Sequence, residues 1–196
     1  FAVQDISSML VVPVASPNPG DYVIDVCSAP GGKSLHAADV MGGTGMVEAR
    51  DVSEYKTGLI KENIRRCGMR NIRVVCQDAR VWDAASADAA DVVIADLPCS
   101  GLGTLRKKPE IRYRMTEETI EGLIRLQREI LEVSCRYVKP GGTLVFSTCT
   151  IDGAENEENT RWFLECHTGF SLAFQRQFFP DEGELDGFYI AKFIRE

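Results

Sequence analysis

The chain has 196 residues and a formal net charge of −7. No apolar run approaches the roughly 20 residues that span a bilayer, and a chain with 44% hydrophobic and 26% charged residues is globular rather than disordered. The acidic balance excludes a protein whose whole surface is a basic footprint for nucleic acid. The chain begins at Phe1 and shows no secretory signal, so we expect one domain, residues 1–196, cut from a longer cytoplasmic protein.

Seven cysteines are scattered along the chain without CxxC spacing, and there are only two histidines, His36 and His167. This pattern does not predict a zinc site or any other metal site. It favours reduced thiols in a cytosolic protein. Four of the seven are expected to be small buried hydrophobes, the commonest role of a free cysteine: Cys67, Cys76, Cys135 and Cys166.

Short β-branched runs alternate with amphipathic segments along most of the sequence. The expected strands cover residues 22–26, 46–50, 72–76, 92–95, 143–147, 172–174 and 188–193. The expected helices cover a short stretch within 5–16 and then 34–41, 54–67, 116–138 and 152–166. Alternation of this kind predicts an α/β fold with a doubly wound, mostly parallel sheet. The two consecutive strands at the end suggest a hairpin that adds an antiparallel strand.

The first strand runs into Cys27-Ser28-Ala29-Pro30-Gly31-Gly32-Lys33, a loop of small residues followed by a helix. Strand, glycine turn and helix together present backbone N–H groups and a helix N-terminus to a polar or anionic cofactor. The loop is neither GxGxxG nor a P-loop. An ordinary turn between strand and helix is the alternative, and Lys33 could equally cap the turn or contact a catalytic site.

Acidic residues stand at the ends of three successive strands, at Asp51, Asp78 and Asp96. Asp51 lies about 20 residues beyond the loop, where nucleotide-binding α/β proteins hold ribose hydroxyls. One such acid is more often a cap or a turn residue. Three at the same edge of a sheet favour a ligand crevice.

Two cysteine motifs also follow strands. They are Asp96-Leu97-Pro98-Cys99-Ser100-Gly101 and Ser147-Thr148-Cys149-Thr150. Because the carboxyl ends of parallel strands meet at one edge, both cysteines can reach the same crevice. Five basic residues follow the first motif, and we expect segment 104–114 to contact an anionic partner: Arg106, Lys107, Lys108, Arg112 and Arg114. A second basic set is interpreted as a solvated face: Lys61, Arg65, Arg66, Arg70 and Arg73.

These motifs resemble the Sun-type RNA cytosine-5 methyltransferases, whose bacterial members modify ribosomal RNA. The resemblance covers nearly the whole chain and includes, besides the loop and the two cysteine motifs, Val3-Gln4-Asp5, Glu155-Asn156-Glu157 and Asp186-Gly187-Phe188. Ser28 is a mild departure from the family's usual small residue. The resemblance implies a Rossmann-like class I methyltransferase fold. Family members carry N-terminal RNA-binding domains, so the chain is expected to be the catalytic domain alone, and a monomer.

The resemblance also implies S-adenosylmethionine as cofactor, small-subunit ribosomal RNA as partner, and a role for each motif. The cofactor loop would be Cys27, Ser28, Ala29, Pro30, Gly31, Gly32 and Lys33. Asp51 would hold the ribose hydroxyls, Asp78 would contact the adenine end, and Asp96 would lie by the methionine end and the target base. Cys149 matches the family's nucleophile, and Cys99 matches the cysteine that assists product release.

The chemistry explains why two cysteines are wanted. C5 of cytosine is a poor nucleophile until a thiolate adds to C6, which requires one thiol of lowered pKa. Asp96 at N3 could offset the charge that builds on the ring, and a second thiol could assist the elimination that frees the enzyme. The target base must be flipped out or single-stranded.

Four rival interpretations are less consistent with the sequence. A DNA cytosine-5 methyltransferase would use the Pro-Cys cysteine as nucleophile. An amino-methylating enzyme would show an Asn/Asp-Pro-Pro-aromatic motif, and a NAD-dependent oxidoreductase would show GxGxxG. A non-catalytic RNA- or cofactor-binding module would have lost a motif cysteine or the loop, and all three are present.

Overall fold

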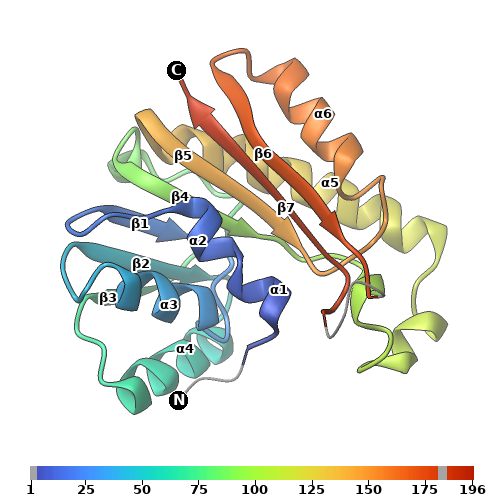
Figure 1. The fold of residues 1–196 in the computed structure, drawn as a ribbon, viewed down its shortest axis with the longest axis horizontal. Coiled ribbons are helices and arrows are strands. Elements are labelled where there is room, and N and C mark those ends of the chain that lie inside the picture. Colours follow the sequence, from blue (N-terminus) through green and yellow to red (C-terminus); the bar gives the residue numbers. More distant parts are fainter. Residues whose placement is uncertain (1–3, 181–184) are drawn as a thin grey trace.

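The computed structural model describes residues 4–180 and 185–196, so Val3 of the quoted motifs lies outside the described residues. Within this part of the chain, seven strands form one sheet in the order β3-β2-β1-β4-β5-β7-β6 (Figure 1). Strand β7 pairs antiparallel with β5 and with β6, and the other pairs are parallel. The strands are β1 Tyr22–Asp25, β2 Met46–Asp51, β3 Ile72–Cys76, β4 Ala90–Asp96, β5 Val138–Thr148, β6 Phe170–Phe178 and β7 Phe188–Arg195. The predicted doubly wound sheet with a closing antiparallel hairpin is confirmed.

Helices cover both faces of the sheet (Figure 1). They are α1 Ile6–Met9, α2 Val11–Ala15, α3 Gly32–Val40, α4 Glu54–Cys67, α5 Glu117–Ser134 and α6 Glu157–Cys166, with 3₁₀ turns η1 Ala84–Ser86, η2 Leu102–Thr104, η3 Pro109–Tyr113 and η4 Cys135–Tyr137. The short helix expected within 5–16 is two helices. Side chains cap α4 and α5, since Ser53 accepts from Lys56 N and Thr116 accepts from Thr119 N. Gly68 ends α4 at φ +71°.

The central strand β4 explains why its sequence is continuously apolar. Val93 and Ala95 face one core cluster, which includes Ile130 of α5. Val92 and Ile94 face the other cluster, which includes Val12 and Ala37 of α2 and α3. Both faces of the strand are therefore buried, as in parallel sheets generally.

Several predicted boundaries differ from the structure. Strand β6 covers Phe170–Phe178 rather than 172–174, and α3 begins at Gly32 rather than at residue 34. Strand β5 begins at Val138 rather than 143 and passes through Pro140-Gly141-Gly142. Its pairing with β4 shifts between Ala90 and Val92, which accommodates the extra residues. Helix α5 ends at Ser134, with η4 completing the stretch to Tyr137.

Helix α6 begins at Glu157 rather than at residue 152. Polar side chains hold the preceding residues in a loop instead of a first helical turn. Ala154 N donates to Asp152 Oδ1 over 2.8 Å, and Asn156 Nδ2 donates to Thr150 O over 3.1 Å. Such side chain to backbone bonds compete with the helical pattern.

The strand order sets the position of the site. β1 pairs with β2 on one side and with β4 on the other, so the chain reverses its winding direction between β1 and β4. Ligands of doubly wound sheets bind at the carboxyl ends of the strands beside this switch point. The register places Asp96, the last residue of β4, beside Ser147 of β5.

Candidate active site

Cys99 and Cys149 lie side by side at this edge of the sheet. Their Sγ atoms are 3.4 Å apart, and both cysteines are partly buried free thiols. The register of β4 and β5 causes the approach, because Cys99 follows Asp96 by three residues and Cys149 follows Ser147 by two. The hydrogen bond from the Cys99 thiol lowers the pKa of Cys149 against the opposing effect of burial. The same hydrogen bond, together with burial, raises the pKa of Cys99.

A partly buried ion pair stands beside the cysteines. Lys33 Nζ, from the first turn of α3, lies 2.5 Å from Asp96 Oδ2. Ser147 Oγ donates to Asp96 Oδ1 over 2.7 Å, and Lys33 Nζ also donates to Ser8 Oγ over 2.8 Å. The lysine side chain is only 10% exposed. A buried ammonium needs such partners, so Lys33 contacts the site rather than merely capping the turn.

Contacts with β2 and α4 fix the conformation of the loop at residues 27–33. Gly31 has φ +106°, which favours glycine, and a Cβ there would lie 3.4 Å from Ile60 of α4. Asp51 Oδ2 accepts from Ala29 N over 2.9 Å, and Asp51 Oδ1 lies 3.1 Å from Lys56 Nζ. Inside the loop, Ser28 Oγ lies 2.8 Å from Ser34 Oγ. Strand β2 thus fixes the conformation of the loop after β1.

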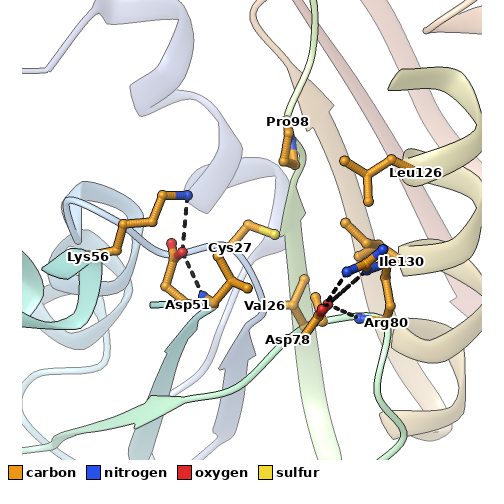
Figure 2. Close-up of a pocket in the computed structure, with 11 residues that line it drawn as sticks. Val26, Cys27, Asp51, Lys56, Asp78, Arg80, Pro98, Leu126 and Ile130 are labelled. Carbon is orange, nitrogen blue, oxygen red and sulfur yellow. Dashed lines mark hydrogen bonds and ion pairs between the residues drawn. The ribbon is translucent and has the colours of Figure 1, made fainter. Parts of the chain in front are cut away.

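Two adjoining cavities follow the loop, and Cys27 lines both. The larger one, of about 270 Å³, holds Asp51 and Asp78 at its polar ends, while the rest of its wall is mainly apolar (Figure 2). Figure 2 shows the two acids on opposite sides of Cys27, with Asp51 directed to Lys56 and Asp78 to Arg80. The apolar lining residues are Val26, Val52, Ala79, Pro98, Leu126 and Ile130.

The smaller cavity, of about 120 Å³, is lined by Lys33, Asp96 and Asp25. Asp25 is 1% exposed, and its Oδ1 is buried without a hydrogen-bond partner among the described residues. Burial raises the pKa of Asp25 to about 6. The three predicted acids therefore divide between the cavities, with Asp51 and Asp78 in the larger and Asp96 in the smaller.

Sequence reasoning missed the polar support behind the cysteines. Gln127 of α5 is 0% exposed and donates from Nε2 to Pro98 O, over 2.9 Å, and to Glu155, over 2.9 Å. Its Oε1 accepts from Asn159 of α6 over 2.7 Å. The available signal was a glutamine among the apolar positions of α5. Asp25 was missed as well, although it ends the strand that enters the loop.

The expectation for the other cysteines is wrong for two of them. Cys135 is buried and Cys67 is partly buried, whereas Cys76 and Cys166 are exposed. Cys76 ends the edge strand β3, and Cys166 ends α6, so neither lies under a second layer. No group of three or more His, Cys, Asp and Glu residues is placed to hold a metal ion in the described ranges. In those ranges, no helix is long and apolar enough to cross a membrane.

The five basic residues after the first motif are all exposed. Lys107 is anchored by two carboxylates, Asp5 at 2.6 Å and Asp186 at 2.8 Å. Ile111 of η3 approaches Gly101, since a Cβ there would lie 3.1 Å from its side chain. These contacts fix the segment beside the Cys99 loop. Tyr113, at its end, is 85% exposed.

Residues 12–194 match the model of the family described as 16S rRNA methyltransferase RsmB/F. The chain belongs to this family. The probable ribosomal RNA small subunit methyltransferase B of Bacillus subtilis is 39% identical over 170 residues, which are 86% of this chain and 38% of that protein. The ribosomal RNA small subunit methyltransferase F of Cronobacter sakazakii is 37% identical over 84% of this chain and 35% of that protein.

A solved structure described as NSun6 from Pyrococcus horikoshii with SFG superimposes with a TM-score of 0.85. It is 30% identical and is matched over 98% of this chain and 52% of its own. The fold is therefore the Rossmann-like fold of the S-adenosylmethionine-dependent methyltransferases. The chain spans between a third and a half of the length of these curated relatives.

Proposed function

We propose that the chain is the catalytic domain of a methyltransferase that transfers a methyl group from S-adenosylmethionine to C5 of a cytosine in small-subunit ribosomal RNA. The observation that carries the proposal is the pair of thiols 3.4 Å apart, one with a lowered pKa and the other with a raised one, beside the Lys33–Asp96 ion pair. Membership of the RsmB/F family supports the RNA substrate.

The two cavities fit the proposed cofactor. The larger has apolar walls suited to an adenine ring, with Asp51 placed for ribose hydroxyls and Asp78 for the edge of the base. In the smaller, the unpartnered Asp25 Oδ1 suits the ammonium of the methionine end, next to Lys33 and Asp96. The loop from Cys27 to Lys33 would line the passage between them. When bound, S-adenosylmethionine supplies an electrophilic methyl group on a positively charged sulfur.

The attack begins at Cys149. Its thiolate adds to C6 of the cytosine, and the new S–C6 bond makes C5 electron-rich enough to take the methyl group. Asp96, with Lys33 as proton source, holds a proton at N3 and offsets the charge that builds on the ring. The 2.5 Å contact between Lys33 Nζ and Asp96 Oδ2, both of which line the smaller cavity, supports this role.

Cys99 completes the cycle. Once Cys149 is a thioether, it no longer accepts the hydrogen bond that is the largest cause of the raised pKa of Cys99. Cys99 then loses its proton to solvent and removes the proton from C5. The electron pair of the C5–H bond forms the C5–C6 double bond and expels Cys149 as a thiolate, and the proton at N3 returns through Asp96 to Lys33.

Segment 104–114 would hold the RNA. Arg106, Lys108, Arg112 and Arg114 are exposed and form no ion pair with any residue the structure describes, in a chain of net charge −7. Arg112 and Arg114 flank Tyr113 in the sequence, and the exposed ring of Tyr113 offers a flat face for stacking on an unpaired base. Basic side chains for phosphates beside an exposed aromatic ring are the usual means of holding single-stranded RNA.

The test uses Cys99→Ala and Cys149→Ala variants with ribosomal RNA and S-adenosylmethionine, resolved on a denaturing gel. Cys99→Ala should accumulate a covalent protein–RNA adduct, because addition and methyl transfer proceed but elimination fails. Cys149→Ala should form none. The reverse pattern would assign attack to the Pro-Cys cysteine, as in DNA cytosine-5 methyltransferases. No reaction in the parent chain while the cofactor binds would support a non-catalytic module.

A further inference from the structure

Glu155 is a fully buried carboxylate that none of the proposed steps uses. It precedes α6 and is 0% exposed. Its Oε2 accepts from Ser100 N over 3.0 Å and from Gln127 Nε2 over 2.9 Å, and its Oε1 accepts a short hydrogen bond from Ser100 Oγ. Every one of these partners is a donor, which suits an ionised carboxylate. A buried charge with three donors is a built feature of the site rather than a surface accident.

The carboxylate links the two cysteine motifs. Ser100 directly follows Cys99, and its Oγ lies 2.8 Å from Thr150 Oγ1, which directly follows Cys149. Each sulfur is therefore one residue from a hydroxyl of this network, and Glu155 is the acceptor that orients the serine. The 3.4 Å separation of the sulfur atoms depends on this arrangement as well as on the strand register.

The charges around the pair are unequal. The charged side chains with the largest effects on the two thiols come from four segments of the chain and are Lys33, Asp96, Lys108 and Glu155. The two lysines and Asp96 act on Cys149, and the lysines favour its thiolate. Glu155 acts on Cys99, where a nearby negative charge disfavours a second one. These charges therefore favour ionisation of Cys149 before Cys99.

We propose that Glu155 is a positioning residue that holds Cys99 against Cys149 and keeps Cys99 as the protonated member of the pair. Cys149 is consequently the cysteine that attacks, although both thiols reach the same crevice. The choice of attacker rests on the proposed function, but the order of ionisation is a property of the chain itself. It is measurable without RNA or cofactor.

The experiment is site-resolved alkylation of the chain by iodoacetamide, followed across pH by peptide mass spectrometry. Only the thiolate reacts, so the initial rate reports ionisation. In the parent, Cys149 should react at lower pH than Cys99. Glu155→Gln keeps the shape and removes the charge, and it should raise the rate at Cys99 about tenfold near neutral pH, the effect of one pKa unit. Glu158→Gln, an exposed residue three positions on, is the matched control and should leave both rates unchanged.

A second variant tests the hydrogen bonds of the Ser100 hydroxyl apart from the charge of Glu155. It also covers the case in which Glu155→Gln does not fold. Ser100→Ala keeps the carboxylate but loses the hydroxyl between Glu155 and Thr150. It should preserve the order of reaction while moving the Cys149 profile to higher pH, because the supporting thiol is less well held. Parent-like profiles in every folded variant, or Cys99 reacting first in the parent, would overturn the proposal. A normal profile with no RNA methylation would refute the proposed function and leave this inference intact.

Discussion

The two halves of the sheet build their parts of the site in different ways. On the β1–β2–β3 side, the loop after β1 is shaped by glycines and by one carboxylate, Asp51, which binds backbone and Lys56 at the surface of an open cavity. On the β4–β5 side, buried side chains from four segments hold two thiols in contact. The first half is a binding site formed mainly by backbone groups, which suits a cofactor that binds and dissociates in each catalytic cycle. The second is a fixed polar core, which suits groups that must hold their geometry through a reaction.

The largest effect is expected on breaking the Lys33–Asp96 pair in the second half. Asp96→Asn leaves the buried ammonium without its charge partner. We expect methyl transfer to fall at least about 100-fold, the scale of a lost proton-transfer group, and stability to fall by about 3 kcal/mol. Methyl transfer from labelled cofactor and urea unfolding measure the two effects.

The double variant Lys33→Met/Asp96→Asn is the control for this prediction. It should recover most of the stability, because no unpaired charge remains buried, while activity stays lost. Equal activity of parent and Asp96→Asn would show that the pair is structural only.

Burial of Asp25 beside the smaller cavity is expected to lower the stability of the chain when no cofactor is bound. Its pKa is raised to about 6 by burial, so the folded chain prefers the protonated form. The stability this group contributes is therefore present below about pH 4 and is lost as pH rises through 6. Asp25→Asn should stabilise the chain without cofactor at pH 7 by about 2 to 3 kcal/mol, the value of two pKa units, and the gain should vanish near pH 4.

Urea unfolding at the two pH values measures this gain, with Asp39→Asn as a control that alters charge elsewhere. The same Asp25→Asn variant should bind S-adenosylmethionine more weakly, because the ammonium loses its partner. A variant equally stable at both pH values would contradict the burial argument.

Asp51→Asn tests whether the two halves of the sheet act independently. It removes the charge facing Lys56 and weakens the acceptor for Ala29 N and ribose, so we expect cofactor affinity to fall about tenfold, the range of a charge-assisted hydrogen bond. Isothermal titration measures the affinity. The alkylation order of Cys99 and Cys149 should not change, and a changed order would show that the halves are coupled more closely than their contacts imply.

An effect as small as that of Asp51→Asn is expected in segment 104–114, the proposed RNA contact. Tyr113→Ala should weaken binding of a single-stranded ribosomal RNA oligonucleotide about tenfold, since base stacking contributes about 1–3 kcal/mol. Tyr113→Phe should bind as the parent does. Tyr55, on α4 and 77% exposed, is the matched control. Fluorescence anisotropy measures all three variants, and equal losses at Tyr55 and Tyr113 would argue against a specific platform.

Features that depend on neighbours in sequence could be predicted. The apolar run of β4 and the strand ends at Asp51 and Asp96 are encoded by residues adjacent in the sequence, and from them the fold and the edge where the site lies could be predicted. The contact of Cys99 with Cys149 also followed, because parallel strands end at a common edge.

Features that depend on partners distant in the sequence could not be predicted. Gln127 reaches Glu155 across 28 residues, and no local pattern marks a buried glutamine as a support for a catalytic loop. The same polar network delays the start of α6, because Asn156 binds Thr150 instead of entering the helix. Exposure of Cys76 depends on β3 being an edge strand, which the sequence does not announce.

The central claim is that Cys149 attacks the base while Cys99 releases it. The most direct measurement incubates the chain with S-adenosylmethionine and RNA that carries 5-fluorocytosine. In this base a fluorine replaces the C5 proton that elimination must remove, so the covalent adduct is trapped. Peptide mass spectrometry then locates the modified cysteine. A single adduct is expected, on the peptide that contains Cys149. An adduct on the peptide that contains Cys99 would contradict it.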